Sequence, residues 1–309
     1  MMTIIQKYVM LVALICAAHL SAQSDPWVSF RVDTLGFSTD TRLKEISGLV
    51  HSRHNPNLFW VHNDSGDDPK IYALSSTMNI EREFVMDAAQ HIDWEDMASG
   101  NYEGKPYLFI GDIGDNAARR TSIAVYQVEE PLVNASNEQA RISATPIELI
   151  YPDGPRDAEA LLFDERTKEL IIVTKRDAEA RVYAISLKSI NFMGQNQLQF
   201  IGTLKLEPLA LDLPPMRRYL HYITAADQHS NGQVIIKNYY RAWLYENEAL
   251  LPLKKLLITQ KPKQLPYILE QQGEAIAFDT DGLGYYTTSE CADDGTTHVP
   301  QPLVYYRPN

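Results

Sequence analysis

Cysteine is scarce in this chain of 309 residues, which contains only Cys16 and Cys291. Two cysteines exclude a disulfide-rich scaffold. Cys16 lies in an N-terminal segment that we expect to be removed, so Cys291 remains alone in the mature chain. The fold must therefore be held by a hydrophobic core and not by internal disulfides.

Basic residues are also few, since 28 Lys and Arg stand against 40 Asp and Glu and the net charge is −12. Nucleic acids and anionic membrane surfaces need a basic face, so this balance argues against both as partners. It leaves cations and cationic partners open. Several catalytic signatures are missing as well: the P-loop, G-x-S-x-G, H-E-x-x-H and a complete EF-hand loop.

Long hydrophobic runs are absent, and the apolar segment from Tyr8 to Leu20 covers only 13 residues. A run of this length is too short to span a bilayer. With Lys7 before it and the small residues Ser21 and Ala22 after it, it is typical of a secretory signal peptide. We therefore predict a signal peptide at 1–22 and a mature domain at 23–309. The protein is expected to be exported, to the periplasm or outside the cell, with no membrane span.

The remaining chain contains five copies of one short motif, whose third residues are spaced 48 to 65 residues apart. Internal repeats of this period indicate a repeat architecture. The copies are Glu45–Leu49, Asp93–Met97, Asp157–Leu161, Tyr222–Ala226 and Gln272–Ile276.

Two further β-rich runs follow each motif, and the last of them carries an aromatic residue in every copy. The second runs are Leu58–His62, Tyr107–Gly111, Leu170–Thr174, Val234–Lys237 and Gly284–Thr288. The third runs are Ile71–Leu74, Ala124–Val128, Arg181–Ile185, Ala242–Tyr245 and Leu303–Tyr306. No helical period persists over a long window, which excludes a helical solenoid.

Fourth strands are predicted before the next motif, except in the last copy, where the chain ends. The candidates are Arg82–Met86, Ile147–Tyr151, Gln199–Leu206 and Leu253–Thr259. The strand Trp27–Leu35 at the mature N-terminus can complete the last sheet and so close the ring. The prediction is an all-β, single β-propeller of five four-stranded blades, because closure hides the sheet edges. A six-bladed ring, with a blade built from 207–221, is the alternative.

Acidic residues recur at matched positions of the motif, and the first strand of every blade should line the central channel. The third positions include Glu95, Glu159 and Glu274; two residues earlier stand Glu45, Asp93 and Asp157. Residues i and i+2 face the same side of a strand, so both levels are expected to point toward the axis. Such oxygen-rich clusters suit Ca²⁺. The alternative is that these carboxylates accept backbone hydrogen bonds or hold channel water.

Polar clusters at the ends of the second strands should surround the same mouth. They include His62, Asp64, Asp112, Asn116, Lys175, Arg176, Lys237 and Glu290, with Arg119 nearby. We assign them to ligand binding, since the basic members could hold a phosphate or carboxylate beside a cation. His62 is a candidate general base or metal ligand, and Glu95 and Glu159 are the other catalytic candidates. Tight turns select the same Asn, Asp and Gly residues, and this is the alternative.

These motifs resemble those of exported bacterial propeller proteins similar to the SdiA-regulated and "esterase-like activity of phytase" families, and more distantly β-propeller phytases. The resemblance runs from Arg42 to Tyr306 through V-H-N-D-S-G-D-D (Val61–Asp68), D-W-E-D (Asp93–Asp96), F-I-G-D-I-G-D-N (Phe109–Asn116) and G-E-A-I-A-F (Gly273–Phe278). It implies Glu95, Glu159 and Glu274 as calcium ligands, with Lys175 and Lys237 near phosphate. The chain departs from the phytases in having five units and not six.

Three functions follow from these observations. We favour a module that binds a small molecule, an anionic ligand or an envelope or extracellular protein at a mouth that holds Ca²⁺. The alternatives are a Ca²⁺-dependent phosphoester or ester hydrolase that uses metal-bound water and a non-catalytic envelope scaffold. Fold analogy cannot choose among them.

Overall fold

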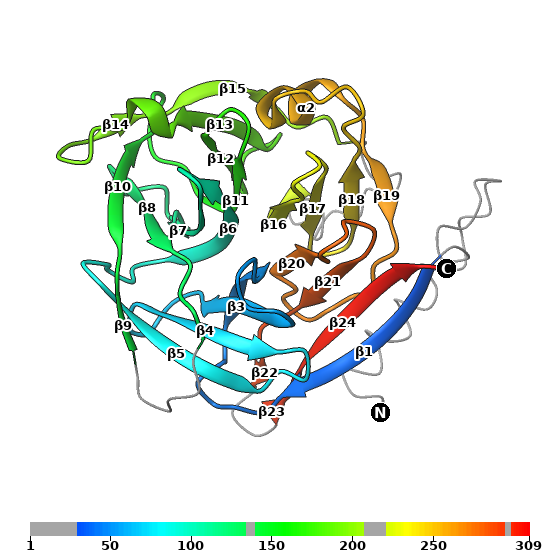
Figure 1. Ribbon diagram of the computed structural model, residues 1–309. Coiled ribbons are helices and arrows are strands. Elements are labelled where there is room, and N and C mark those ends of the chain that lie inside the picture. Colours follow the sequence, from blue (N-terminus) through cyan, green and yellow to red (C-terminus); the bar gives the residue numbers. More distant parts are fainter. Residues whose placement is uncertain (1–29, 134–139, 207–220, 294–297) are drawn as a thin grey trace, which may run out of the picture.

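The protein is an all-β ring of five sheets arranged around a central axis in a computed structural model (Figure 1). The structure describes residues 30–133, 140–206, 221–293 and 298–309. The predicted signal peptide at 1–22 lies outside these residues. In the described part of the chain, no helix is long and apolar enough to cross a membrane.

Each blade contains four strands that pair in antiparallel order from the axis outward. Blade one contains β2 (Ile46–His51), β3 (Leu58–Asn63), β4 (Lys70–Ser75) and β5 (Ile80–Asp87). Blade two contains β6 (Trp94–Tyr102), β7 (Lys105–Asp112), β8 (Ile123–Glu129) and β10 (Thr145–Ile150). Blade three contains β11 (Ala158–Asp164), β12 (Glu169–Thr174), β13 (Arg181–Ser186) and β15 (Gln199–Thr203).

The last two blades follow the same plan, although blade five draws strands from both ends of the described chain. Blade four contains β16 (Ile223–Gln228), β17 (Val234–Asn238), β18 (Ala242–Tyr245) and β19 (Lys263–Leu265). Blade five contains β20 (Ala275–Phe278), β21 (Tyr285–Thr288), β24 (Gln301–Pro308) and β1 (Phe30–Ser38). The predicted five-bladed propeller is confirmed, and the six-bladed alternative is wrong because the five inner strands contact one another around a closed ring.

Additional short elements lie outside this plan. The strands β9 (Ala140–Ser143) and β14 (Asn196–Gln197) add in parallel to the outer strands of blades one and two. A two-stranded sheet pairs β22 (Ala292–Asp293) with β23 (His298–Val299). Within the described ranges, the helical elements are η2 (Leu187–Ser189) and α2 (Leu253–Thr259).

One predicted strand is wrong, because Leu253–Thr259 forms the helix α2. Its buried residues are Leu253, Leu256 and Leu257, which have the i, i+3, i+4 spacing of a helical face. The fourth strand of blade four is instead the short β19, between Pro262 and Pro266. The other predicted strands lie within three residues of the observed bounds, except that β6 continues five residues beyond its motif, to Tyr102.

The ring closes where the N-terminal strand β1 pairs with β24 in antiparallel register, from Phe30 opposite Pro308 to Ser38 opposite Gln301. This confirms the predicted closure; the first three residues of the predicted strand lie outside the described residues. Both strands form the outer edge of blade five (Figure 1). Strands from opposite ends of the chain therefore hold the ring shut.

The hydrophobic core consists of five clusters, and each fills the space between two neighbouring blades. Between blades one and two, for example, Trp60 and Phe84 pack with Trp94 and Met97. The cluster between blades three and four also includes the buried leucines of α2. Burial between sheets, and not within one central core, is what fixes the blades relative to one another.

The middle of the channel is sealed by side chains of the inner strands. Asp96 of β6 accepts hydrogen bonds from the backbone N–H of Leu161 at 2.8 Å and of Ala226 at 3.2 Å. Gln228 of β16 donates to the carbonyl of Ser99 at 2.8 Å and accepts from the N–H of Phe163 at 2.9 Å. These contacts join three blades across the axis and separate the two ends of the channel.

Candidate functional site

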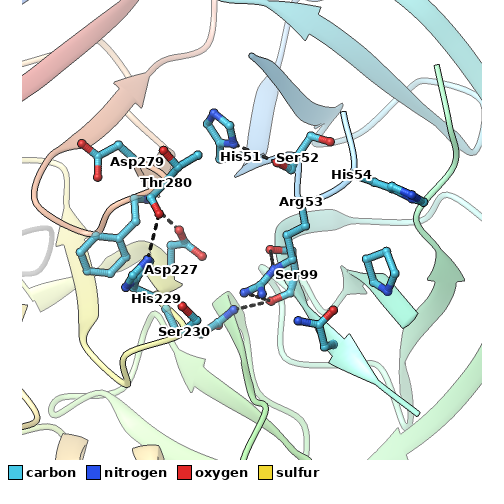
Figure 2. Close-up of a pocket in the computed structure, with 14 residues that line it drawn as sticks. His51, Ser52, Arg53, His54, Ser99, Asp227, His229, Ser230, Asp279 and Thr280 are labelled. Atoms are coloured by element: carbon cyan, nitrogen blue, oxygen red, sulfur yellow. Dashed lines mark hydrogen bonds between the residues drawn. The ribbon is translucent and has the colours of Figure 1, made fainter. Parts of the chain in front are cut away.

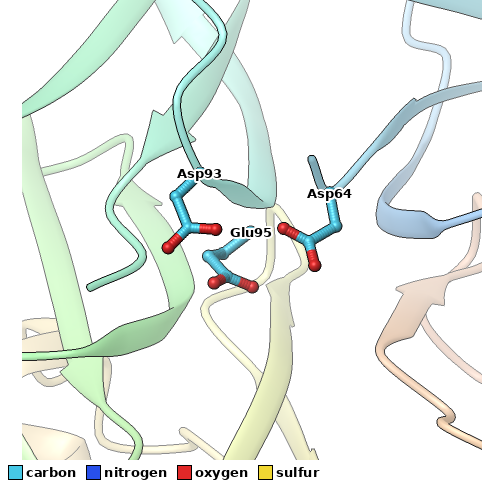
Figure 3. Close-up of side chains that lie close together, drawn as sticks. All are labelled: Asp64, Asp93 and Glu95. Carbon is cyan, nitrogen blue, oxygen red and sulfur yellow. The ribbon is translucent and has the colours of Figure 1, made fainter. Parts of the chain in front are cut away.

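Five carboxylates gather at one end of the channel in two groups that share Asp64. Asp64, Asp93 and Glu95 each offer an oxygen, and these oxygens lie within 4.8 Å of one another. Figure 3 shows the three side chains converging from two neighbouring blades. Asp64, Glu274 and Glu290 meet the same 4.8 Å limit. The sequence analysis had selected all five residues: Asp93, Glu95 and Glu274 as metal ligands at the motif positions, and Asp64 and Glu290 as ligand-binding residues after the second strands.

Backbone hydrogen bonds place Asp64 between blades one and two. It follows β3, its N–H donates to the carbonyl of Glu45 at 2.7 Å, and its carbonyl accepts from the N–H of Trp94 at 3.0 Å. Glu290 is held in the same way beside the start of β20, where its N–H donates to the carbonyl of Gln272 at 3.1 Å. The loops after the second strands therefore carry these carboxylates over the starts of the first strands.

Glycine at position 114 lets the loop after β7 approach two of these carboxylates. A Cβ at Gly114 would lie 2.2 Å from Glu95 Oε1 and 2.5 Å from Asp93 Oδ2. A side chain there would displace both groups. The second glycine of the F-I-G-D-I-G-D-N motif is thus explained by close packing against the acidic mouth.

β-bulges occur at the repeated motif position in four of the five blades. The strand register shifts beside Ser47, Glu95, Glu159 and Thr224. A bulge changes the direction of a side chain relative to the regular alternation. In these four blades, the common orientation of residues i and i+2 that regular alternation predicts therefore cannot be assumed.

Burial and mutual repulsion raise the pKa values of the clustered carboxyls. Burial, followed by the charge of Asp93, raises the pKa of Asp64 to about 8. Burial, followed by the charge of Glu274, raises the pKa of Glu290 to about 10. Burial and Asp64 also hold the pKa of Glu95 well above its ordinary range. Such a group either keeps protons or takes a cation.

Lys175 provides a positive charge at the edge of this cluster. Its ammonium group is hydrogen-bonded to Glu159 Oε1 and lies 3.7 Å from Glu274 Oε1. Both Glu159 and Lys175 are buried, and Glu159 Oε2 has no hydrogen-bond partner among the described residues. Glu159 thus lies outside the two carboxylate groups but is connected to them through Lys175.

Other predicted site residues take part in two ion pairs with arginines. Arg176 forms an ion pair with Asp157 at 2.5 Å and also donates to Asn116 Oδ1. Asp112 forms an ion pair with Arg120 at 2.7 Å. Asp157 and Asp112 are therefore balanced by arginines and do not belong to either carboxylate group. Glu45 also lies outside both groups, although its charge contributes to the raised pKa of Asp64.

Lys237 is fully buried in the neighbouring part of blade four. It donates to the carbonyl of Gly273 and lies 3.4 Å from Thr224 Oγ1. Burial lowers its pKa to about 8. Its ammonium group therefore donates hydrogen bonds to a backbone carbonyl and a hydroxyl oxygen of blades four and five.

His62 occupies the position of a core histidine. Its Nδ1 lies 2.9 Å from the carbonyl of Asn63, and its ring packs edge-on against Trp94 with centroids 5.4 Å apart. Burial lowers its pKa to about 4, so the ring is neutral at pH 7. A Cβ at Gly48 would lie 2.2 Å from Nε2. The catalytic assignments of His62, Glu95 and Glu159 stay predictions.

Sequence reasoning missed two side chains of the mouth. Tyr239 donates to Glu274 Oε1 at 2.5 Å, and Lys175 lies 5.3 Å from the centre of its ring. Arg120, and not its neighbour Arg119, forms the ion pair with Asp112. Tyr239 directly follows Lys237 and Asn238, so extending the polar cluster by one residue would have found it. The choice between two adjacent arginines in a loop carried no sequence signal.

Comparison with known proteins gives no sequence relative: no protein-family model matches the chain, and no curated protein matches it. Among solved structures, the chain is similar to one from the crystal structure of a nidogen/laminin complex. The two share 11% identity over 80% of this chain and 73% of the other, with a TM-score of 0.44. The function must therefore be argued from the site itself.

Proposed function

We propose that this protein is an exported propeller that binds a ligand or partner at the acidic mouth, with a Ca²⁺ ion held among the mouth carboxylates. The observation that carries the proposal is the position of Asp64, which belongs to both carboxylate groups. Its Oδ1 is buried and has no hydrogen-bond partner among the described residues. A buried carboxylate oxygen without a donor is costly unless a cation or a proton compensates it.

The donor set favours Ca²⁺ over other ions. All five members of the two groups are carboxylates, and hard oxygen ligands suit Ca²⁺ or Mg²⁺. Ca²⁺ accepts six to eight oxygens in flexible geometry, whereas Mg²⁺ demands a near-ideal octahedron. Carboxylates contributed by loops and strand starts of three blades match the more flexible ion better.

The basic side chains of the mouth are paired with carboxylates, and this supports ligand binding over phosphoester hydrolysis. A phosphate would need free positive groups, but Lys175 is neutralised by Glu159 and Glu274. Arg176 is likewise paired with Asp157. A Ca²⁺ ion at the mouth can still exchange water for an oxygen of an anionic small molecule or of an acidic segment of an envelope or extracellular protein.

Calcium titration tests this proposal directly. We expect protein freed of metal with a chelator to release heat on addition of CaCl₂ in isothermal titration calorimetry. Its melting temperature should rise, since ligand at 100 times Kd stabilises a protein by about 2.7 kcal/mol. Asp64→Asn should weaken Ca²⁺ binding at least tenfold, because both groups lose a ligand.

The matched control is Glu129→Gln, which removes an exposed carboxylate whose partner is Lys105 in blade two. This variant should bind Ca²⁺ like the unaltered protein. Identical melting curves in CaCl₂ and in chelator would overturn the calcium site. Turnover of p-nitrophenyl phosphate that requires Ca²⁺ and is lost in Asp64→Asn would replace the binding role with a hydrolase.

A further inference from the structure

A pocket of about 450 Å³ opens at the end of the channel opposite the acidic mouth. Mouth carboxylates lie at the starts of β6 and β20, whereas the pocket is lined by residues that end inner strands: His51 of β2, Gln228 of β16 and Phe278 of β20. Along β6, four residues separate Glu95 from the pocket residue Ser99, which corresponds to about 13 Å. The seal formed by Asp96 and Gln228 lies between the two ends.

Asp227 brings a buried carboxylate with one unpartnered oxygen to the wall of this pocket. The side chain is 4% exposed, and its Oδ2 accepts from the N–H of Phe278 at 2.8 Å. Its Oδ1 is buried without a hydrogen-bond partner among the described residues. Figure 2 shows the carboxyl group extending from the wall toward the centre of the lining side chains. The protein thus leaves one carboxylate oxygen without a donor at the pocket.

His51 lines the pocket with a neutral ring. Its Nδ1 lies 2.9 Å from the carbonyl of Ser52, which requires a proton on Nδ1 because a carbonyl only accepts. Burial lowers the pKa of the ring, so Nε2 carries a lone pair at pH 7. By contrast, both nitrogens of His229 are engaged, with Thr280 and Asn231.

Arg53, the cation of the wall whose charge is permanent, and the amide donor Gln228 are already engaged. Arg53 donates to Ser99 through Nε at 3.1 Å and Nη2 at 3.3 Å, and its Nη1 forms an ion pair with Glu165 at 2.6 Å. Gln228 is satisfied in the channel seal. Asp279 also lines the wall, but its carboxylate already accepts from the N–H groups of Leu283 and Gly284 and from the hydroxyl of Tyr305. The pocket therefore combines one unfilled acceptor, Asp227 Oδ1, with an excess of negative charge.

We propose that this pocket is a second binding site and takes a small organic cation with a primary ammonium group. Such a group carries three donors and one positive charge, which match the unpartnered Asp227 Oδ1 and the charge of the wall. Phe278 and Pro106 supply apolar surface for the carbon part of the ligand. A neutral hydroxyl compound would satisfy the hydrogen bonds but leave the charge uncompensated.

Saturation-transfer NMR at pH 8 tests the proposal with two probes of the same shape, benzylammonium and benzyl alcohol. We expect benzylammonium to bind at least tenfold more tightly than the alcohol. Asp227→Asn should weaken benzylammonium binding at least tenfold and leave the alcohol unchanged. Equal affinity for the two probes, or an Asp227→Asn variant that binds benzylammonium normally, overturns the proposal.

Two further measurements keep the test decisive. In the unaltered protein, benzylammonium should shift the amide resonance of Phe278, because this N–H donates to Asp227. A resonance that does not shift at saturating benzylammonium contradicts the site. This measurement needs no variant, so it decides the question even if Asp227→Asn fails to fold. Benzylammonium binding that depends on Asp64 instead would place the cation at the mouth and also overturn the proposal. Because calcium binding is measured separately, failure here leaves the proposed function untouched.

Discussion

Equivalent residues of the five repeats have different roles because their immediate partners differ. Ser47 and Thr224 occupy the same motif position as Glu95 and Glu159, but their hydroxyls donate to the backbone of the next blade, at Glu95 and Gly273. Glu95 instead faces other carboxylates, and Glu159 is bonded to Lys175. The residue at this motif position therefore connects neighbouring blades in some copies, and in others it supplies a carboxylate to the charged groups of the mouth.

At the pocket, the ionisation of Asp227 makes stability depend on pH. Burial raises its pKa from the ordinary 3.8 to about 7 in the folded protein. The folded state thus holds the proton more tightly than the unfolded chain, and this contribution to stability is complete below about pH 4 and lost as the pH rises to about 7. Asp227→Asn has no such proton to lose, so it should gain stability relative to the unaltered protein over this range.

Urea unfolding of the unaltered protein and of Asp227→Asn between pH 4 and pH 8 measures the difference in their unfolding free energies. This difference should approach about 4 kcal/mol by pH 7. The other charged and titratable side chains of the pocket are common to both proteins and cancel: His51, Arg53, His54, His229 and Asp279. Two unfolding free energies that change in parallel with pH would contradict the raised pKa of Asp227.

At the scale of elements, the sequence predicted nearly all of the strands, but it did not predict that one segment, Leu253–Thr259, forms a helix. Repetition, β-rich runs and an aromatic in each third strand located nearly every strand, because these are local properties of the sequence. The segment Leu253–Thr259 was assigned by its place in the repeat, although its leucines have helical spacing. Burial of that face against β13 and β15 decided the outcome.

Substitutions in α2 distinguish a helix from a strand in solution. Leu256→Ala and Leu257→Ala each remove a buried side chain and should each cost about 2–5 kcal/mol of unfolding free energy, because adjacent residues can share the buried face of a helix but point to opposite faces of a strand. Lys255→Ala, an exposed position, is the control and should change stability by less than about 0.5 kcal/mol. A large loss for only one of the two leucine variants in denaturant unfolding would contradict the helical packing.

For the whole molecule, the channel seal makes the propeller one structure with two separate ends. Asp96 lies in β6 but accepts from the backbone of β11 and β16, so a single carboxyl links three blades. The mouth and the pocket lie on either side of it. Ligands at the two ends should therefore bind independently of each other.

Removal of this link should destabilise the entire ring. Asp96→Ala leaves the buried N–H groups of Leu161 and Ala226 without an acceptor, each at a cost of about 1–3 kcal/mol. We expect a total loss of about 2–5 kcal/mol in a single unfolding transition followed by circular dichroism. Asp96→Asn retains one acceptor oxygen of the same shape and should lose less. Equal stability of Asp96→Ala and the unaltered protein would show that the blades do not depend on this link.

The sequence by itself determined the class of fold, the number of blades, the closing strand and the end of the channel where the acids gather. These follow from local pattern and repetition, which place equivalent residues at equivalent points of a closed ring. Only the tertiary structure decided which of those acids meet. Asp93 and Glu95 converge with Asp64, whereas Asp157 and Glu159, with identical spacing, bind Arg176 and Lys175. Blades two and three share the bulge at this position. The difference lies in the partners: the loop after β3 brings Asp64 to the first pair, and the loop after β12 brings Lys175 and Arg176 to the second, which spacing along one strand does not encode.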